Sequence, residues 1–433
     1  MNNCIEIESL NNNQYIYNYK YNIIIQKELY SEEMIEKIAN QYFCMSRPIS
    51  EKEFLENEDF DKPRCLGLVL TDSCNFRCKY CANSDQYKYS KGFFNNRMSS
   101  EVLEAAIKMY VEKYSKAVIS DPNLTFSVMF YGGEPLIEYK LIKKAVDLIV
   151  NYYKIKNPIF TITTNGSLIN DEMINFFKKY NFDINISMDG YKEINDKNRV
   201  TINNEPTFDL VLNNFNKLKS ELGNKVGIIT TFDTQVSPMK LYKFYCENES
   251  IAESLRRVSS VNNVNTNYYN NIDNYELYDK ELNQIFSLIK KGKDNNFLKQ
   301  LYNDKFLALT TRKEFYNILF SCCSPISAKL TVSTNGNLHI CEKVNENYPI
   351  GNVYTGIDYR KAYKYYENVI KIRNEKCSSC EYHNICNPCY AQLNVGGDTF
   401  ELSDKYCEWM KEATMRTLRL YCTFLDNEMW PEF

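Results

Sequence analysis

Apolar runs and amphipathic stretches alternate through the middle of the chain. Short runs rich in apolar and β-branched residues predict six strands, at Leu66–Leu70, Leu124–Tyr131, Pro158–Thr163, Phe182–Met188, Val226–Phe232 and Leu255–Val261. Stretches with apolar residues at helical spacing lie between them, at Glu101–Lys116, Ile137–Tyr153, Asp171–Tyr180, Phe208–Leu222 and Lys240–Glu249. Strands that alternate with helices indicate a parallel sheet with right-handed crossovers. We therefore predict an α/β fold, a partial (β/α)6 barrel with its functional site at the carboxyl ends of the strands.

The segments on either side of this region follow other patterns. Residues 14–25 alternate polar and apolar side chains, which predicts a β-hairpin, and a helix-like stretch follows Ser31. An element of this kind can cover an end of the barrel or dock a peptide, and both roles fit equally well. We divide the chain into a hairpin-plus-helix element (1–60), the barrel (61–265), a helical bridge (266–320), a cysteine-rich domain (321–410) and a C-terminal helix (411–433).

Composition narrows the classes of protein to consider. A chain of 433 residues with 44% hydrophobic residues is long enough for two or more domains. Its net charge is −3 and its basic residues are scattered, which argues against a nucleic-acid partner. No apolar run is long enough to cross a membrane and the first residues do not form a signal peptide, so we expect a soluble, cytoplasmic protein.

The chain has 16 cysteines and only 2 histidines. In a cytoplasmic protein so many cysteines are more often metal ligands than disulfides. Cys74, Cys78 and Cys81 form a C-x3-C-x2-C triad just after the first predicted strand. Three thiolates on one loop can hold three irons of a [4Fe-4S] cluster and leave the fourth open to a small molecule, because full ligation takes four cysteines. A zinc knuckle or three unconnected core thiols are the alternatives.

The triad, with the aromatic Tyr80 before its last cysteine, resembles the cluster loop of radical S-adenosylmethionine (SAM) enzymes. In that family the amine and carboxylate of SAM chelate the open iron. Two glycines in a strand end let the backbone approach a ligand closely, and a neighbouring glutamate can accept a hydrogen bond from an ammonium group. Three strand ends strengthen the resemblance: Tyr131-Gly132-Gly133-Glu134-Pro135, Thr163-Thr164-Asn165-Gly166 and Ser187-Met188-Asp189-Gly190, the last followed by Arg199.

The resemblance implies a set of SAM-binding residues. It places Glu134 at the SAM amine, Ser187 at the ribose or carboxylate, and Arg199 at the carboxylate, which suits the fork of a guanidinium group. The full set is Tyr80, Gly132, Gly133, Glu134, Pro135, Thr163, Asn165, Ser187, Asp189 and Arg199. Without the resemblance, Asp189-Gly190 is an ordinary turn and Arg199 a partner in a surface ion pair.

A second set of cysteines occupies the C-terminal part of the chain, with the pattern Cys323, Cys341, Cys377-x2-Cys380-x5-Cys386-x2-Cys389 and Cys407. It resembles the SPASM domain of radical SAM enzymes, which holds two further [4Fe-4S] clusters. The family usually has three residues where Asn387-Pro388 stands here. The resemblance assigns an outer cluster to Cys377, Cys380, Cys386 and Cys407. It assigns an inner cluster to Cys323, Cys341 and Cys389, with Cys322 as a candidate fourth ligand; a four-cysteine zinc site is the alternative.

The resemblance also implies an activity. Radical SAM enzymes of this kind reductively cleave SAM to a 5′-deoxyadenosyl radical that abstracts hydrogen, and most of them act on ribosomally made peptides. We therefore predict a maturase that uses SAM and three [4Fe-4S] clusters to install a thioether or carbon–carbon crosslink in a Cys-rich precursor peptide. Flavodoxin or ferredoxin is the expected reductant. The alternatives are an anaerobic sulfatase-maturating enzyme, which makes formylglycine, and a non-catalytic iron–sulfur or zinc scaffold, which has no need of the Gly-Gly-Glu-Pro segment.

Two assignments concern single residues. Glu342 directly follows Cys341, and in sulfatase-maturating relatives an acid at this place is proposed to take a proton. Glu342 is therefore a candidate catalytic base, and a surface glutamate is the alternative. The five remaining cysteines are expected to pack as small apolar side chains: Cys4, Cys44, Cys65, Cys246 and Cys422. For Cys422, hydrogen donation to the substrate is a second possible role.

Overall fold

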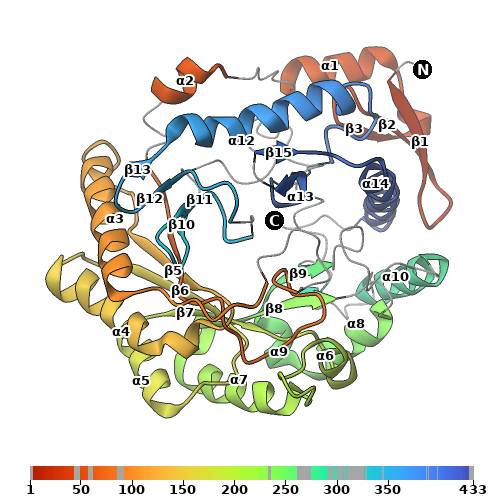
Figure 1. Cartoon of the computed structure of the whole chain (residues 1–433). Coiled ribbons are helices and arrows are strands. Elements are labelled where there is room, and N and C mark those ends of the chain that lie inside the picture. Colours follow the sequence, from red (N-terminus) through yellow and green to blue (C-terminus); the bar gives the residue numbers. More distant parts are fainter. Residues whose placement is uncertain are drawn as a thin grey trace.

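The computed structural model describes most of the chain, and Figure 1 shows how its elements are arranged. The described residues are 3–42, 49–56, 62–84, 92–232, 236–260, 275–290, 296–297, 300, 306, 309, 326, 329–343, 346–386, 388, 390–396 and 398–428. Three of the expected metal ligands, Cys322, Cys323 and Cys389, lie outside these residues. So does most of the expected helical bridge, within which α10 covers Tyr275–Lys290.

The centre of the fold is an eight-stranded sheet with the order β11-β10-β4-β5-β6-β7-β8-β9. Every neighbouring pair from β4 to β9 is parallel. These strands are the ones predicted from the sequence: β4 Leu66–Val69, β5 Ser127–Tyr131, β6 Ile159–Thr164, β7 Asp183–Ser187, β8 Val226–Phe232 and β9 Leu255–Ser260. The α/β class and the partial barrel are therefore confirmed.

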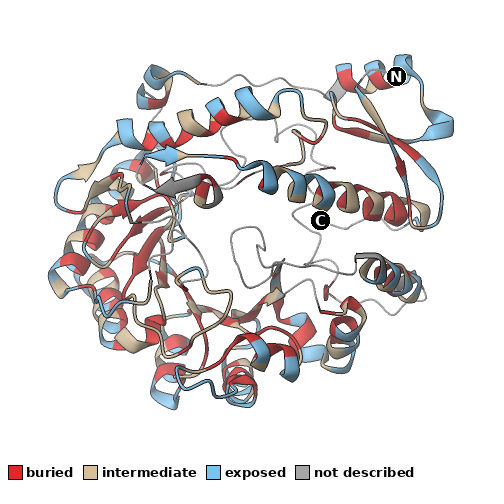
Figure 2. Cartoon of the chain, turned by 45° about the vertical axis from the view of Figure 1, so that its right-hand side comes forward, coloured by how far each residue is buried: buried red, intermediate tan, exposed pale blue. Residues whose placement is uncertain are grey.

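Side chains alternate between the two faces of this sheet. In β5, Val128 and Phe130 are buried, whereas Ser127, Met129 and Tyr131 are only half-buried. Strands β6 and β7 repeat the alternation. The buried face packs against helices on the outside of the barrel (Figures 1 and 2). Because successive side chains of a strand point to opposite faces, the half-buried side chains line the barrel interior, where they can meet a ligand.

Helices connect the strands and cover the outer face: α3 Ser100–Ser120, α4 Tyr139–Asp147, α5 Asp171–Lys179, α6 Lys192–Asn198, α7 Phe208–Leu222, α8 Pro238–Glu247 and α9 Glu249–Glu253. The side chains of Ser99, Asn170 and Ser237 cap α3, α5 and α8. The sequence pattern missed α6, because its buried face carries Ile194 and otherwise asparagine. Among the helices of the described residues, none combines the length and apolarity needed to cross a bilayer.

The C-terminal part of the chain joins the barrel sheet. Strand β10 (Leu330–Val332) pairs in parallel with β4, and β11 (Leu338–His339) pairs antiparallel with β10. Cys341 and Glu342 follow β11 at once, so this pairing carries them to the barrel. The remaining elements are β12 Gly351–Asn352, β13 Gly356–Ile357, α12 Tyr359–Ile372, α13 Tyr390–Leu393, β14 Asn394–Gly396, β15 Thr399–Phe400 and α14 Asp404–Asp426.

The N-terminal element is a small antiparallel sheet, β1 Cys4–Glu8, β2 Gln14–Asn18 and β3 Ile23–Gln26, followed by α1 Glu32–Tyr42 and α2 Glu51–Glu56. The expected hairpin is β2 with β3, and β1 adds a third strand. Helix α14 holds this sheet (Figure 1). The Tyr15 hydroxyl donates to Asp426 Oδ1 at 2.6 Å, and Leu10 N donates to Thr423 Oγ1 at 2.9 Å.

Candidate active site

The cysteine triad occupies a buried loop after β4. Arg77 N and Lys79 N donate to the carbonyl oxygens of residues 200 and 198 at 2.8 and 2.9 Å, which fixes the loop against the chain after α6. Burial raises the pKa of the Cys78 thiol to about 12; Arg199 opposes this shift, and Cys81 and Cys74 add to it. The three thiols therefore share one buried region. Thiolates are the ligands that iron–sulfur clusters use, and a buried thiol gains from binding iron, so this donor set fits such a cluster.

Gly132 and Gly133 press directly against that loop. A Cβ atom at Gly132 would lie 2.5 Å from the carbonyl oxygen of Thr71, and one at Gly133 would overlap the carbonyl oxygen of Ser73. Gly133 N donates to Thr71 O at 2.7 Å, and Glu134 N donates to Ser73 O at 2.8 Å. The glycines are thus required by the contact between the end of β5 and the cysteine loop, which joins these two motifs into one site.

Glu134 is a buried carboxylate at the centre of the strand ends, with 1% of its surface exposed. Its Oε1 accepts from Leu136 N at 3.0 Å and from Thr164 Oγ1 at 2.7 Å, and its Oε2 accepts from Asn165 N at 2.7 Å. Burial raises the pKa of Glu134 to about 7, although these three donors oppose the shift. A carboxylate has about four lone-pair sites, so one remains for a ligand ammonium group.

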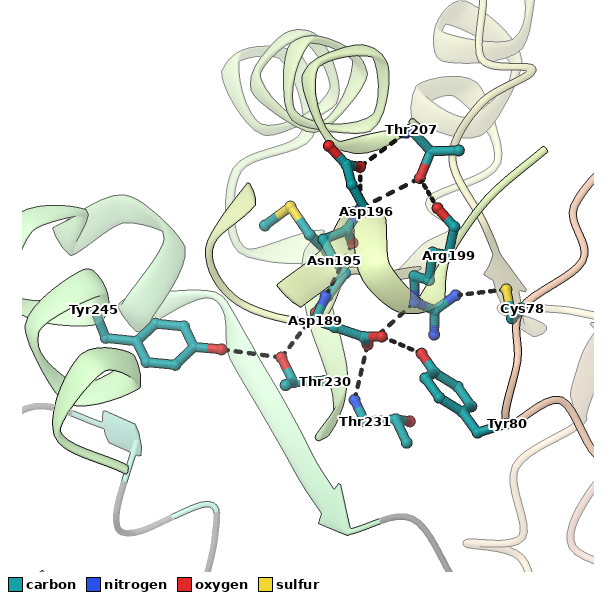
Figure 3. A network of polar contacts seen from close by, with 11 residues as sticks. Cys78, Tyr80, Asp189, Asn195, Asp196, Arg199, Thr207, Thr230, Thr231 and Tyr245 are labelled. Atoms are coloured by element: carbon teal, nitrogen blue, oxygen red, sulfur yellow. Dashed lines mark hydrogen bonds and ion pairs between the residues drawn. The ribbon is translucent and has the colours of Figure 1, made fainter. Parts of the chain in front are cut away.

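Arg199 lies in a buried polar network (Figure 3). Its Nε is 3.1 Å from Asp189 Oδ1, and its Nη1 donates to Cys78 Sγ at 3.8 Å. Asp189 also accepts from the Tyr80 hydroxyl and from Thr231 N. Burial alone would lower the pKa of Arg199, but Asp189, Tyr80 and Cys78 together raise it. The alternative of a surface ion pair for Arg199 is therefore wrong, because only 7% of this residue is exposed.

Helix α6, which the sequence pattern missed, positions Arg199. Asn195 Oδ1 accepts from Asp189 N at 3.2 Å, and Arg199 N donates to Asn195 O at 2.7 Å. Thr207 Oγ1 donates to Arg199 O at 2.7 Å, and Thr207 N donates to Asp196 Oδ1 at 2.9 Å (Figure 3). The backbone of Asn195 and the side chain of Thr207 therefore hold the backbone of Arg199, and Asp196 in turn holds Thr207.

The other expected SAM-binding residues lie at the same end of the sheet. Thr163 and Ser187 are half-buried on the interior face, near the ends of β6 and β7. Asn165 Nδ2 donates to Asn75 Oδ1, inside the cysteine loop, at 2.8 Å. Pro135 opens the short helical turn Pro135–Glu138 that the Glu134 side chain caps. The structure thus brings all ten expected SAM-binding residues together with the triad, as neighbours on four consecutive strand ends.

Four of the C-terminal cysteines also gather in one place. Burial raises the pKa of Cys386 to about 12, and Cys377 and Cys380 add to that shift. Cys407, on α14, adds to it and also raises the pKa of Cys377. Cys380 N donates to Cys377 O at 3.0 Å, which makes a tight turn between the first two. These are the four ligands expected for the outer cluster, and thiols are the ligands that such a cluster uses, although in the described residues no three side chains of this kind are arranged to hold a metal ion.

Glu342 lies inside the barrel, not on the surface, so the alternative of a surface glutamate is wrong. Its side chain is 8% exposed and contacts the ammonium group of Lys329. Cys341 Sγ donates to Glu342 Oε2 at 3.5 Å. Burial alone would raise the pKa of Glu342, but Lys329, a backbone hydrogen bond and Lys343 together lower it. Glu342 is therefore a carboxylate at neutral pH, able to accept a proton.

Sequence reasoning missed Tyr131, the residue directly before Gly132. Burial raises the pKa of its hydroxyl; Glu342, Cys81 and Cys341 add to the shift, and Arg199 opposes it. The hydroxyl is thus near both the triad loop and the Cys341–Glu342 segment. It has no hydrogen-bond partner within the described residues. The alternation of β5 could have identified it, because Ser127, Met129 and Tyr131 share the interior face.

The unassigned cysteines differ from one another. Cys422 is fully buried on α14 near Tyr15 of the N-terminal sheet, in agreement with the expectation that it packs in the core. Cys4 and Cys65 are half-buried, and Cys44 lies outside the described residues. Cys246 is exposed on α8, so the expectation that it packs in the core is wrong.

Residues 68–236 match the model of the radical SAM superfamily. This enzyme therefore carries a radical SAM domain. The superfamily uses SAM and a [4Fe-4S] cluster, so those two cofactors are confirmed at the level of the family. Among curated proteins, the chain is 26% identical to a cysteine-type anaerobic sulfatase-maturating enzyme of Clostridium novyi, over 75% of this chain and 87% of that protein.

A second relative has a different activity. The radical SAM cyclopropyl synthase TigE of Paramaledivibacter caminithermalis is 23% identical, over 76% of this chain and 68% of TigE. Among solved structures, anSMEcpe with bound AdoMet and a Cp18Cys peptide has a TM-score of 0.62 at 20% identity, covering 84% of this chain and 98% of that one. Streptococcus suis SuiB bound to its precursor peptide SuiA has a TM-score of 0.53 at 15% identity, covering 93% and 98%. These structures share the fold of this chain.

Proposed function

We propose that this enzyme is a peptide maturase that oxidises a cysteine-containing precursor peptide, with a thioether or carbon–carbon crosslink as the product. One observation carries the proposal. The cysteine loop, the Gly132-Gly133-Glu134 strand end and the Asp189–Arg199 pair meet at one end of the sheet, and Cys341 with Glu342 reaches the same interior. A scaffold would need the cysteines but not the buried carboxylate and guanidinium beside them.

Different residues at this end of the sheet bind different parts of SAM and the cluster. Cys74, Cys78 and Cys81 hold the cluster, and the remaining lone pair of Glu134 accepts from the SAM ammonium group. Arg199, kept charged by Asp189, takes the SAM carboxylate with the part of its fork that Asp189 leaves free. When bound, the cluster and SAM supply a 5′-deoxyadenosyl radical that removes a hydrogen atom from the substrate.

The C-terminal cysteines hold the clusters that accept an electron from the substrate after its hydrogen atom has been removed. Cys377, Cys380, Cys386 and Cys407 hold an outer cluster, and Cys341 helps to hold an inner one, with Cys322, Cys323 and Cys389 as its other candidate ligands. Glu342, next to Cys341 and charged, accepts the proton that the substrate loses. An external one-electron reductant, of the flavodoxin or ferredoxin kind, donates an electron to the cluster held by the triad.

The N-terminal sheet suits a docking role for the leader part of a precursor peptide. Its order is β1-β2-β3, so the outer edges of β1 and β3 have no strand partner within the described residues. Strand addition at such an edge gives affinity through backbone hydrogen bonds. SuiB, which covers 93% of this chain, and anSMEcpe, which covers 84%, were both solved with a bound peptide, which supports a peptide substrate for this chain.

The second candidate function is oxidation of a sulfatase cysteine to formylglycine. The similarity to the Clostridium novyi enzyme over 75% of this chain favours it. Both reactions take a hydrogen atom, an electron and a proton from a cysteine-bearing segment, so the same residues serve either one.

The test is to offer the anaerobically reconstituted enzyme two synthetic peptides and follow mass by spectrometry. One is a Cys-rich peptide encoded beside the gene, and the other carries the cysteine motif of a sulfatase. Loss of two hydrogens from the first supports crosslinking, and conversion of the second to an aldehyde supports formylglycine formation. Formation of 5′-deoxyadenosine with neither peptide changed would refute both. Chains with Glu342→Gln should form less product from whichever peptide is used.

A further inference from the structure

Lys329 is a charged residue inside the barrel that the sequence pattern did not single out. It stands one residue before β10, at the level of Cys65, whose carbonyl oxygen accepts from Leu330 N at 2.9 Å. Its aliphatic stem crosses Gly67, because a Cβ there would lie 3.5 Å from Lys329 Cδ and 3.5 Å from Met129 Cε. Since Met129 belongs to the interior face of β5, the stem of Lys329 runs over the interior face of the sheet.

The ammonium group of Lys329 contacts the carboxylate of Glu342 across the β10–β11 pair. The two side chains are only 18% and 8% exposed. A charge buried to this extent is costly without a partner, and removal of one ion of such a pair leaves the other uncompensated. Lys329 therefore fixes where the carboxylate of Glu342 lies, and it does so next to Cys341, whose Sγ is 3.5 Å from Glu342 Oε2.

The pair faces the space into which the cysteine loop also opens. Strand β10, which Lys329 precedes, pairs with β4, and β4 pairs with β5, whose end contacts the cysteine loop through Gly132 and Gly133. An ion pair that served only to fasten β10 to β11 could lie on either face of the sheet. This pair lies on the interior face, and the absence of a side chain at Gly67 gives the lysine its path there.

We propose that Lys329 is a positioning residue that holds the Glu342 carboxylate beside Cys341 as the acceptor of the substrate's proton. The inference rests on the proposed function. For a cysteine substrate that has already lost a hydrogen atom from carbon, the S–H bond breaks as a new carbon–sulfur bond forms. The proton passes to a Glu342 oxygen, and the remaining electron passes to an oxidised iron–sulfur cluster. Lys329 does not exchange a proton in this step; it keeps the accepting oxygen in place.

The test compares the wild type with Lys329→Met, Lys329→Arg, Glu342→Gln and the double variant Lys329→Met/Glu342→Gln. The control is Lys143→Met, which removes an ion pair with Glu172 whose side chains are 44% and 66% exposed. The first readout is the unfolding midpoint of the anaerobically reconstituted enzyme in denaturant. We expect Lys329→Met to lower the midpoint, the double variant to recover most of the loss, and the control to match the wild type.

The second readout is the amount of product per 5′-deoxyadenosine, with the cysteine-containing peptide that the wild type converts. Lys329→Met should lower this ratio about tenfold or more, since a positioned general base contributes at least that much. Lys329→Arg should recover most of it, and KM for the peptide should change less than about twofold. The double variant should match Glu342→Gln, because Lys329 acts through Glu342.

Each outcome decides a separate question. A Lys329→Met enzyme with the ratio of the wild type overturns the positioning role, even if its chain is less stable. If Lys329→Met does not fold, a double variant that falls well below Glu342→Gln overturns it as well, because Lys329 then acts independently. A wild type that cleaves SAM but changes no cysteine-containing peptide refutes the proposed function, and Lys329 is then only a structural partner of Glu342.

Discussion

The two cysteine-bearing regions of this enzyme are assembled in different ways. The triad occupies one short loop, and its shape is set by contacts with neighbouring strand ends, above all the approach of Gly132 and Gly133 to Thr71 and Ser73. The outer C-terminal group takes three cysteines from the turn after α12 and its fourth, Cys407, from α14. The first site thus depends on one parallel sheet, and the second depends on how the turn after α12 meets α14. Substitutions in one region should therefore leave the other cluster site intact.

The largest effect should come from the cysteines themselves. With Cys74, Cys78 and Cys81 all changed to Ala, we expect about eight irons per chain where the wild type binds about twelve, and no SAM cleavage. With Cys377, Cys380 and Cys386 changed to Ala, iron should fall by a similar amount, but 5′-deoxyadenosine should still form. The measurements are iron and sulfide content after anaerobic reconstitution and dithionite-driven SAM cleavage. Cleavage by the first variant would exclude the triad from the SAM site.

Arg199→Ala should come next in size. It leaves Asp189, which is fully buried, without its cation, and breaking a buried pair costs about 3–5 kcal/mol. We expect weaker SAM binding by calorimetry and a lower unfolding midpoint, with iron content unchanged. Arg199→Lys is the control, because it keeps the charge and loses the fork. Equal SAM affinity in Arg199→Ala and the wild type would remove Arg199 from the SAM site.

Gly133→Ala tests the contact between strand end and cysteine loop. The added methyl group overlaps the carbonyl oxygen of Ser73, so the loop must move, at a cost of about 3 kcal/mol or more. The control is Gly223→Ala, where φ is +57° and the Cβ meets nothing within 4 Å, so only backbone strain of about 1–3 kcal/mol is expected. Denaturant unfolding measures both. A smaller loss for Gly133→Ala than for Gly223→Ala would show that the loop adjusts freely.

The smallest expected effect is the pH dependence of SAM binding. Burial raises the pKa of Glu134 to about 7 from its ordinary 4.5. Between pH 6 and pH 8 the ionised fraction then rises from about a tenth to about nine tenths, so SAM affinity should rise about five- to tenfold. Glu134→Gln, titrated in the same buffers, should keep only the pH dependence of SAM itself. Identical pH profiles would mean that Glu134 does not contact the ammonium group.

The same raised pKa affects stability with the opposite sign. The folded chain favours the protonated form of Glu134, and the unfolded chain ionises it at the ordinary value. The free energy of unfolding of the SAM-free protein should therefore fall as the pH rises from about 4.5 to about 7, by up to about 3 kcal/mol. The slope should be absent from Glu134→Gln, which thermal unfolding across this pH range can check.

The sequence predicted the parts of the fold and of the site that depend on residues close together along the chain. The six parallel strands follow from local runs of apolar residues, and the triad and the strand-end motifs follow one another along the chain, so the site at the strand ends could be assembled before the structure was known. The sequence analysis missed helix α6 because its buried face is mostly polar. Asn195 and Asn198 are both buried, and Asn195 takes part in the Arg199 network, but a search for apolar periodicity ignores such residues.

The interior of the barrel was predicted less well, because it depends on pairing between distant segments. Lys329 and Glu342 meet only because β10 joins β4 and turns back through β11. Neither strand has more than three residues, which is too short for a periodic signal. The strand alternation that exposes Tyr131 to the interior was visible in the sequence, but its closeness to Cys341 was not.

The hold of α14 on the first strands has a consequence for how the chain is made. Tyr15 and its acceptor Asp426 are separated by 411 residues. At about 5–20 residues per second, a ribosome needs about 20 to 80 s to synthesise that interval. During this time the opening segment has been translated but cannot yet occupy its final place. A nascent chain interrupted before α14 therefore has its barrel strands but lacks the helix that contacts its first sheet. The N-terminal sheet can make these contacts only after translation is nearly complete.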